Sequence, residues 1–403
     1  MIYYAWLTWA VPLLSVPLLP LAAAIDGRLR GFVAVLSAGL SLAFALLLAA
    51  SYQSPTIERF GPLLPYPGSF LQVDIDGLSV LVAAFVTFVS FLVVVYSLGY
   101  MKDEPGQTRY YSLVLLFIGS MVGLVMSGNL IQFYFFWELM GVCSALLIAF
   151  WTDRPPARQA GLKAFFVTRL GDTALLIAVL ALAATFGSTS FDALLGPGGV
   201  VTLGGGAAFA IGLLVVIGAM GKSAQVPLHV WLPDAMEGPT TVSALIHAAT
   251  MVNAGVFLLL RMYPLLTLPQ LSGSLSSFIL TVGLISALVG GASALAADDI
   301  KRVLAYSTIS QLGLMFAAIG LGSMQAAAYH MVSQGLFKAL AFLAAGSVVT
   351  SLGTRDMAEM GGLAKVMKYA YVGFLVSVLA MAGLPPLVGF WSKDAILGLA
   401  VSA

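Results

Sequence analysis

Residues 208–236 read AFAIGLLVVIGAMGKSAQVPLHVWLPDAM, an apolar stretch that is interrupted by Gly221, Lys222 and Pro227. A helix of about 20 apolar residues crosses the hydrocarbon core of a bilayer, and this stretch is longer than that. Glycine and proline weaken or break a helix, and here they flank the lysine. A charge at the centre of a membrane helix costs at least about 2.5–3.5 kcal/mol, so it must be paired, hydrated or functional. The stretch therefore predicts a broken membrane helix with a cation at its break.

A second stretch repeats this pattern near the other end of the chain. Residues 369–400 read YAYVGFLVSVLAMAGLPPLVGFWSKDAILGLA and carry Gly383, two prolines and Lys393. Interrupted hydrophobic segments at corresponding positions of two halves are typical of inverted-repeat transporters, whose broken helices line the ion site. We therefore expect two inverted five-helix repeats within one transmembrane domain, at 111–263 and 274–403, preceded by three helices in 1–110.

The composition extends this interpretation to the whole chain. Of 403 residues, 60% are hydrophobic and 9% are charged, whereas soluble domains average about 45–50% and 25%. An all-α, multi-pass membrane protein is predicted, with the lipid bilayer as its solvent. About twelve apolar runs are long enough to span, at 6–25, 31–51, 77–100, 111–126, 130–151, 161–186, 207–228, 240–263, 274–297, 303–322, 325–351 and 370–402.

The distribution of basic residues between the predicted loops indicates an orientation. Cytoplasmic loops carry the excess of lysine and arginine. With the N-terminus outside, only Arg59 and Arg261 fall in extracytoplasmic loops. Four basic residues fall within spans, at Arg169, Lys222, Lys338 and Lys393. Twelve fall in cytoplasmic loops, namely Arg28, Arg30, Lys102, Arg109, Arg154, Arg158, Lys163, Lys301, Arg302, Arg355, Lys365 and Lys368.

Several function classes are excluded by what the sequence contains. The net charge of +1 and the absence of basic tracts with interleaved aromatics argue against nucleic acid as a partner. The single cysteine, Cys143, forms no CxxC pair for a metal or iron–sulfur cluster, and it is interpreted as a small buried hydrophobe. The three histidines show no ligand spacing for zinc, so no metal site is expected.

Opposite charges in the first predicted repeat suggest a proton-transfer element. Glu138 follows the aromatic run FYFFW, and Lys222 on another span is its candidate partner. Moving the carboxylate away would let a desolvated lysine release its proton. A static ion pair that only orders helix packing is the alternative. Arg169 and Asp172, three residues apart, are expected to form a structural ion pair with each other.

Polar residues in the second half follow helix faces. His330, Gln334 and Lys338 recur at intervals of four, which places them on one face over about 12 Å. The stripe Thr240, Ser243, His247 and Thr250 is weaker and also fits hydrogen bonding between helices, although His247 is expected to be functional. Further candidates for a water wire are Ser307 and Gln311, whose neighbourhood also fits backbone hydrogen bonding, and Asp394 beside Lys393.

Six segments together carry a specific resemblance to a known family. The chain resembles the antiporter-like membrane subunits of respiratory complex I, which are related to the large subunits of multisubunit sodium/proton antiporters. Among these subunits it is most similar to the distal one, of the L or 5 type. The segments are FFWELMGVCSALLIAFW at 135–151, FFVTRLGD at 165–172, GAMGKSAQVPLHVWLPDAMEGPTTVSALIHAATMVNAGV at 218–256, DDIKRVLAYSTISQLGLM at 298–315, HMVSQGLFKALAFLAAGSV at 330–348 and LPPLVGFWSKD at 384–394.

The resemblance implies an order for the buried charges. The family's helix-five glutamate matches Glu138, its broken-helix lysine matches Lys222, and its helix-eight histidine matches His247. The central histidine and lysine match His330 and Lys338, and the exit lysine matches Lys393. Gln334 stands where relatives often have a second histidine, and it cannot carry a proton charge near neutral pH.

The resemblance also implies a function and a setting. Such a subunit translocates protons in a quinone oxidoreductase, with other membrane-arm subunits as partners. It is a non-redox subunit without a cofactor of its own, while flavin, iron–sulfur clusters and quinone are expected in partner subunits. A bacterial or archaeal cell membrane is the expected location. Family members continue beyond the position of Ala403 with a thirteenth helix, so the second repeat is expected to be incomplete.

Two other function classes remain open from the sequence alone. The first is a subunit of a sodium/proton antiporter, or of a related hydrogenase or bicarbonate-uptake complex, that uses the same module. The lysines do not separate this class from a redox-driven proton pump. The second is a scaffold that conducts no ions, which an unformed channel in the second half would favour.

Overall fold

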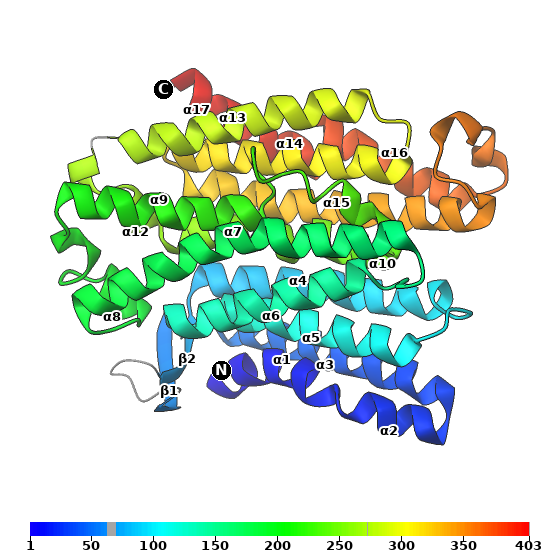
Figure 1. Cartoon of the computed structure of the whole chain (residues 1–403), viewed down its shortest axis with the longest axis horizontal. Coiled ribbons are helices and arrows are strands. Elements are labelled where there is room, and N and C mark those ends of the chain that lie inside the picture. Colours follow the sequence, from blue (N-terminus) through cyan, green and yellow to red (C-terminus); the bar gives the residue numbers. More distant parts are fainter. Residues whose placement is uncertain (63–69, 272, 403) are drawn as a thin grey trace.

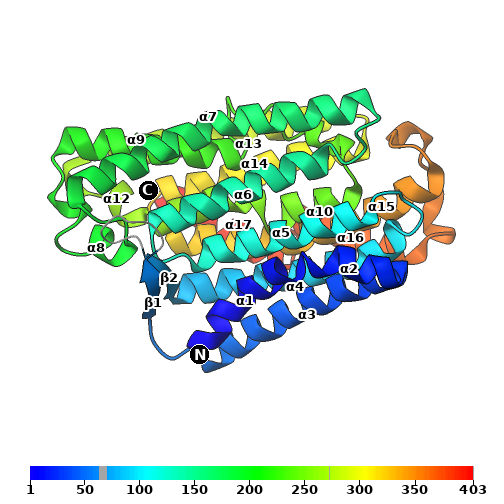
Figure 2. The same ribbon diagram turned by 60° about the horizontal axis from the view of Figure 1, so that its bottom comes forward.

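The computed structural model is an elongated bundle of long helices that run side by side (Figure 1). It describes residues 1–62, 70–271 and 273–402. One end of the bundle carries a β-hairpin and the connections 187–204 and 262–271, and we call it the hairpin end. The opposite end carries the connections 101–106, 149–154 and 353–367, and we call it the basic end (Figures 1 and 2).

Ten described helices are long and apolar enough to span a bilayer when α10 and α11 are taken as one span, and the bent pair α1 and α2 makes an eleventh. The pair is bent by 48° between Ser15 and Leu18. The helices are α1 Ile2–Ser15, α2 Leu18–Ile25, α3 Gly27–Ser51, α4 Gly77–Tyr100, α5 Gln107–Met126, α6 Leu130–Ile148, α7 Pro155–Phe186, α9 Gly205–Lys222, α10 Thr240–Ala248, α11 Met251–Arg261, α13 Ser274–Leu295, α14 Ile300–Gly320 and α15 Met324–Leu352.

The last predicted span differs from the others because it is divided. The run at 370–402 forms two helices of 15 residues each, α16 Lys368–Ala382 and α17 Val388–Ser402. Gly383 ends α16 with φ +83°, a left-handed conformation that glycine adopts without a Cβ clash. The two prolines that follow cannot continue a helix. The count of about twelve full spans is therefore not reproduced, although every predicted run contains helix.

The sequence analysis did not predict a β-hairpin. Strands β1 Thr56–Pro62 and β2 Phe70–Ile75 pair antiparallel, with Glu58 opposite Val73. It is fixed to the bundle at Gln72, whose backbone N–H donates to Gln132 Oε1 at 2.8 Å and whose carbonyl accepts from Gly128 N. Short helices cover the two ends, at α8 Phe191–Leu195, η1 Val200–Thr202, η2 Asp234–Glu237, α12 Tyr263–Leu266, η3 Pro269–Leu271, η4 Met357–Glu359 and η5 Leu363–Lys365.

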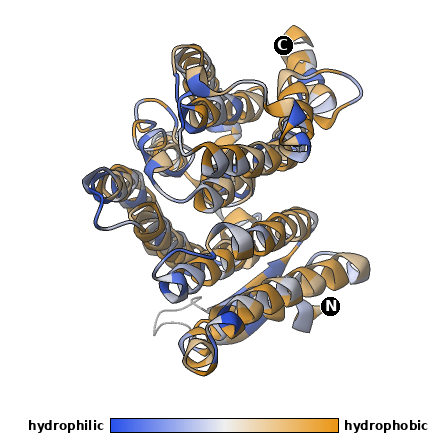
Figure 3. Ribbon diagram, turned by 90° about the vertical axis from the view of Figure 1, so that its right-hand side faces the viewer, coloured by the Kyte–Doolittle hydropathy of each residue, from blue (hydrophilic) through white to orange (hydrophobic). Residues whose placement is uncertain are grey.

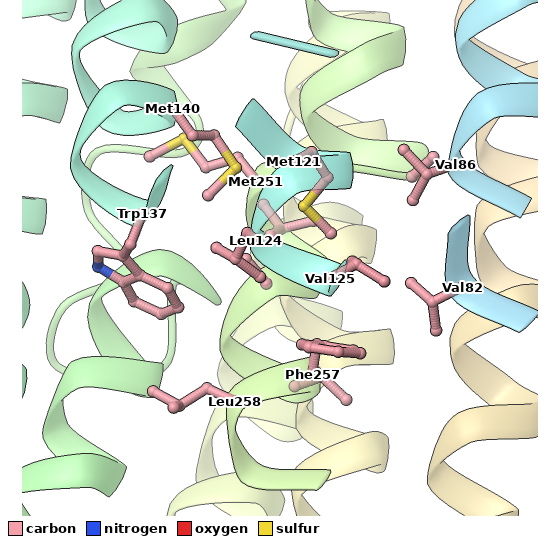
Figure 4. Close-up of a cluster of buried hydrophobic side chains, with 14 of the residues drawn as sticks. Val82, Val86, Met121, Leu124, Val125, Trp137, Met140, Met251, Phe257 and Leu258 are labelled. Carbon is pink, nitrogen blue, oxygen red and sulfur yellow. The ribbon is translucent and has the colours of Figure 1, made fainter. Parts of the chain in front are cut away.

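Apolar residues cover the outside of the bundle as well as its core. Viewed along the helices, hydrophobic colouring extends over their outer faces (Figure 3). Phe32, Phe166 and Leu288 expose 63%, 63% and 74% of their surface, and a soluble monomer rarely exposes large apolar patches. The core between α5, α6 and α11 is packed by side chains such as Met121, Trp137 and Phe257 (Figure 4). The chain is a multi-pass integral membrane protein.

Candidate functional site

The break at the end of α9 lies where glycines bring α7 and α9 close together. A Cβ on Gly221 would come within 3.2 Å of Gly171 Cα, and one on Gly218 would come within 2.9 Å of Leu175 Cβ. Small residues allow such close packing of membrane helices. The contact places Lys222, at the last turn of α9, beside Asp172 of α7.

Lys222 and Asp172 form an ion pair inside the bundle. Lys222 Nζ lies 3.1 Å from Asp172 Oδ2, and the two side chains are 0% and 2% exposed. Trp137 Nε1 of α6 donates to the other carboxylate oxygen at 2.5 Å. The ammonium also lies 5.6 Å from the centre of the Trp137 ring. The pair is therefore held by three helices, α6, α7 and α9.

Glu138 and Arg169 form a second ion pair nearby, which corrects the sequence-based pairing. Arg169 contacts Glu138 at 2.5 Å, with side-chain exposures of 36% and 20%, and Tyr134 also donates to Glu138. The predicted pairs Arg169–Asp172 and Glu138–Lys222 are thus wrong, because the partners are exchanged. Along α7 the helix turns Arg169 toward the outer surface and Asp172 toward α9, so their short spacing does not bring them together.

The predicted span at 240–263 contains a break of its own beside His247. α10 ends at Ala248 and α11 begins at Met251. Thr250 Oγ1 donates to Leu245 O at 2.6 Å, and Asn253 Nδ2 donates to Ala248 O at 2.7 Å. These side chains satisfy the carbonyls that the interrupted helix leaves free.

His247 lies at the end of α10 and is fully buried. Its ring packs against Phe342 with centroids 4.7 Å apart, and neither ring nitrogen has a hydrogen-bond partner among the described residues. Gln334 Nε2 of α15 donates to the backbone carbonyl of His247 at 3.0 Å. Ser243, earlier on the same helix, donates to Pro239 O at 3.4 Å. The imidazole is thus a buried group whose two nitrogens are free to take part in proton transfer.

Lys338 lies fully buried at the centre of α15. Its Nζ donates to Leu304 O at 3.1 Å and to the hydroxyl of Ser307, both on α14. Ser307, a predicted water-wire residue, therefore contacts the lysine. Gln311, one turn further along α14, is 6% exposed and its Oε1 has no partner among the described residues. Both of these partners of Lys338, among the residues that the structure describes, are neutral.

His330 and Lys393 lie where α15 meets α17. His330 Nδ1 is 2.9 Å from Ser392 Oγ. Lys393 Nζ donates to Met381 O at 2.5 Å, near the C-terminal end of α16, where a free carbonyl is expected. Asp394 is exposed, because adjacent residues of a helix point in different directions. Asp394 is thus not one of the buried groups, and its part in a water wire stays a prediction.

Two buried basic residues were missed by the sequence analysis, which placed them in loops. Arg261 is 7% exposed and contacts Asp76 at 2.6 Å and Asp74 at 3.2 Å. Lys301 is 3% exposed and lies in the first turn of α14. Both residues lie at the ends of apolar runs, where hydropathy predicts an exposed loop. Their burial results from other segments that pack over the ends of these helices, which hydropathy does not show.

The buried polar groups form a series through the bundle. We call the following groups the buried series: Lys222 with Asp172, His247, Gln334, Lys338, and His330 and Lys393 where α15 meets α17. The groups lie on helices that pack on one another, since α9 packs on α11, α10 on α15, and α15 on both α14 and α17. Lysine and histidine can each bind and release a proton, so the series is suited to proton transfer.

Two family profiles match the chain. The profile described as "NADH:quinone oxidoreductase/Mrp antiporter, TM" matches residues 127–403. The profile described as "NADH-Ubiquinone oxidoreductase (complex I), chain 5 N-terminus" matches residues 70–111.

Curated relatives of high similarity come from cyanobacteria and chloroplasts. NAD(P)H-quinone oxidoreductase chain 5 of Synechocystis sp. is 48% identical over 82% of this chain and 50% of its own length. Chain 5 of Picosynechococcus sp. is 43% identical over 99% of this chain and 63% of its own. The chain thus spans about half to two thirds of the length of these relatives.

Solved structures share the fold. The Mrp complex from Dietzia sp. contains a chain with a TM-score of 0.89 and 33% identity, which covers 98% of this chain and 43% of that one. An archaeal membrane-bound sulfane sulfur reductase matches with a TM-score of 0.87 at 24% identity, over 98% of this chain and 81% of that one.

Proposed function

Because this chain belongs to the family of membrane subunits described as NADH:quinone oxidoreductase/Mrp antiporter, we propose that it translocates protons as a subunit of a quinone oxidoreductase complex. The relatives with the chain 5 name are 48% and 43% identical, which favours the redox complex over the antiporter. The observation that carries the proposal is the series of buried Lys and His side chains. Intramembrane ionisable residues of this kind mark ion pathways.

The first half of the series supplies the lysine whose proton affinity can be switched. Asp172 contacts Lys222 directly, and Glu138 lies within electrostatic reach of Asp172. Glu138 is held in turn by Arg169 at the outer surface of the bundle. Opening the outer pair would change the charge that Asp172 and Lys222 experience, and it would thereby bias Lys222 toward holding or releasing its proton.

The second half supplies the acceptors. His247 stands between the break in α10–α11 and Lys338, whose neutral partners Leu304 O and Ser307 do not fix its charge. A proton that leaves Lys222 passes His247 to Lys338. Lys393 on α17 then receives the proton from Lys338. His330, which contacts Ser392 on the same helix, lies next to this last step. Each transfer moves the proton, and with it one positive charge, from one side chain to the next. No residue of the pathway therefore has to stay charged without a partner.

The setting of the subunit follows from the same family. Other membrane-arm subunits are its proposed partners, and the non-redox role leaves flavin, iron–sulfur clusters and quinone to those partners. A bacterial or archaeal membrane is proposed, with the hairpin end outside. Cysteines placed at exposed Ser54 and Lys102 test the orientation. Impermeant maleimide should label the first from outside whole cells and the second only after lysis, and the reverse pattern contradicts it.

The function is tested by purifying the tagged chain in mild detergent from the cells that contain it. We expect flavin and iron–sulfur subunits to copurify. After reconstitution into vesicles, NAD(P)H and quinone should drive quenching of a pH-sensitive dye that an uncoupler reverses. Copurification with small membrane subunits alone, together with dye responses to sodium jumps and none to NAD(P)H, would contradict the proposal and establish the antiporter.

A further inference from the structure

Lys301 is a buried lysine that the proposed pathway does not yet use. It is the second residue of α14 and is 3% exposed. Its Nζ donates to Met236 O at 2.7 Å and to Gly238 O at 2.8 Å. Both carbonyls belong to the connection 223–239 between α9 and α10. The ammonium thus lies where the first half of the chain meets the second.

The partners of Lys301 do not fix its charge. Among the described residues, no carboxylate lies within 4.0 Å of its Nζ, whereas the neighbouring Arg355 contacts Glu237 at 3.1 Å and Asp299 at 3.3 Å. The guanidinium thus takes the carboxylates and leaves the amine with carbonyl oxygens. A buried lysine of this kind can lose its proton, whereas arginine stays protonated.

The solvent side of Lys301 is polar and hollowed. A hollow of about 570 Å³ at the basic end is lined by Asp299 and Arg355 among others. A second hollow of about 380 Å³ is lined by Glu237. The side chains of Glu237 and Asp299 are 21% and 20% exposed, so they reach both solvent and the surroundings of Lys301. Polar side chains therefore lie between the solvent at the basic end and Lys301.

The inner side of Lys301 faces the buried series. Leu304, whose carbonyl accepts from Lys338 Nζ, follows three residues later on α14, about 4.5 Å along the helix. Gly238, which holds Lys301, lies just before the start of α10, and His247 lies within electrostatic reach of both Lys301 and Lys338. The polar faces of α10 and α14 therefore converge on Lys301 at the basic end.

We propose that Lys301 takes up protons from solvent at the basic end and passes them to Lys338. The neutral amine of Lys301 forms an N–H bond with a proton delivered from the hollows. That bond breaks as the neutral amine of Lys338 gains the proton, and Lys301 returns to its neutral form. This inference rests on the proposed function. It adds an uptake site for the second half of the series, and protonation changes at Lys222 are still required for flux.

The opposing explanation is that Lys301 only clamps the connection 223–239, and Lys301→Arg separates the two. Arginine keeps the positive charge and several N–H donors for the two carbonyls, but it does not release a proton. The matched control is Lys163→Arg, since Lys163 also holds this connection, through Asp234 at 2.6 Å, but is 43% exposed. Vesicles carrying the assembled complex are assayed for NAD(P)H-driven dye quenching.

We expect the initial quenching rate to fall at least about tenfold in Lys301→Arg, since a positioned acid–base group contributes about 100-fold or more. Lys163→Arg should keep the wild-type rate. If Lys301→Arg does not assemble, Lys301→Gln serves instead, because the amide keeps N–H donors for the two carbonyls but carries no titrating proton, and it should show the same loss. Wild-type quenching in an assembled Lys301 variant overturns the uptake route alone, whereas absence of quenching in the wild-type complex overturns the proposed function.

Discussion

The ion pair between Lys222 and Asp172 shows how a single contact can serve both stability and transport. Burying two charges is expensive, and replacing such a pair by apolar groups often leaves stability unchanged or higher. Fold stability alone therefore does not require it. Trp137 nevertheless donates to Asp172 and lies beside the ammonium, so a third helix keeps the pair in place. An arrangement of this kind suits a group that must give up a proton and recover it.

Lys222→Met separates these roles when it is compared with the double variant Lys222→Met/Asp172→Leu. The single change leaves a buried carboxylate unpaired and should destabilise the fold by about 3–5 kcal/mol. The double change should recover most of that stability while redox-driven proton flux stays lost. Unfolding in detergent and dye quenching in vesicles measure the two quantities. Recovery of flux together with stability would show that the pair only orders the helices.

The sequence did not predict that Asp172 is the partner of Lys222. Lone charges in apolar runs identified Glu138, Lys222 and Asp172 as buried polar groups, because each is costly in lipid. Which carboxylate meets which cation depends on the rotation of α6 and α7 about their axes. Charge spacing within one helix cannot reveal that rotation, so the sequence favoured the local pair of Arg169 and Asp172.

Among the elements, the close approach of α7 and α9 positions the ion pair. Gly171 and Gly221 bring the two backbones together, and a Cβ on Gly221 would meet Gly171 Cα at 3.2 Å. A larger side chain must push the helices apart. Gly206, at the start of α9, faces open space, because a Cβ added there would meet no atom of the described residues within 4 Å. α9 thus contains one glycine packed against a neighbouring helix, Gly221, and one that faces open space, Gly206, which serves as its control.

Gly221→Val should therefore destabilise the protein by about 1–3 kcal/mol, as overpacking does, and should lower proton flux by lengthening the contact between Lys222 and Asp172. Gly206→Val should leave flux unchanged. Thermal unfolding in detergent and dye quenching give the two comparisons. Equal behaviour of the two variants would mean that the α7–α9 approach does not position the site.

The start of α4 is stabilised by Asp76, which caps the helix and binds Arg261. Burial alone raises the pKa of Asp76, but the Arg261 guanidinium and the hydrogen bonds from Ser79 together hold it below its ordinary value. A carboxyl with a lowered folded-state pKa contributes stability above its ordinary pKa. That contribution is lost as the pH falls through the folded value.

Asp76→Ala should accordingly cost about 0.5–2 kcal/mol at neutral pH through loss of the cap. The difference in unfolding temperature between wild type and variant should shrink as the pH drops below the ordinary range of an aspartate. Scans of thermal unfolding against pH measure it. A difference that stays constant into strong acid would contradict the assigned ionisation.

At the scale of the molecule, the membrane helices were readable from hydropathy, whereas the hairpin and the covered ends were not. Each apolar run forms helix because backbone groups in lipid must bond within their own segment. The strand at 70–75 alternates weakly and is held by Gln132 from a distant helix. Lys301 and Arg261 likewise lie at span ends, and only the tertiary fold covers them.

The central claim is that protons cross the bundle through its buried lysines, with Lys338 in the middle. The most direct test compares Lys338→Met with Lys365→Met, which changes an exposed lysine at the basic end. Both complexes are reconstituted and supplied with NAD(P)H and quinone. The claim predicts that uncoupler-sensitive dye quenching disappears in Lys338→Met and stays at the wild-type rate in Lys365→Met. Undiminished quenching by an assembled Lys338→Met complex would contradict it.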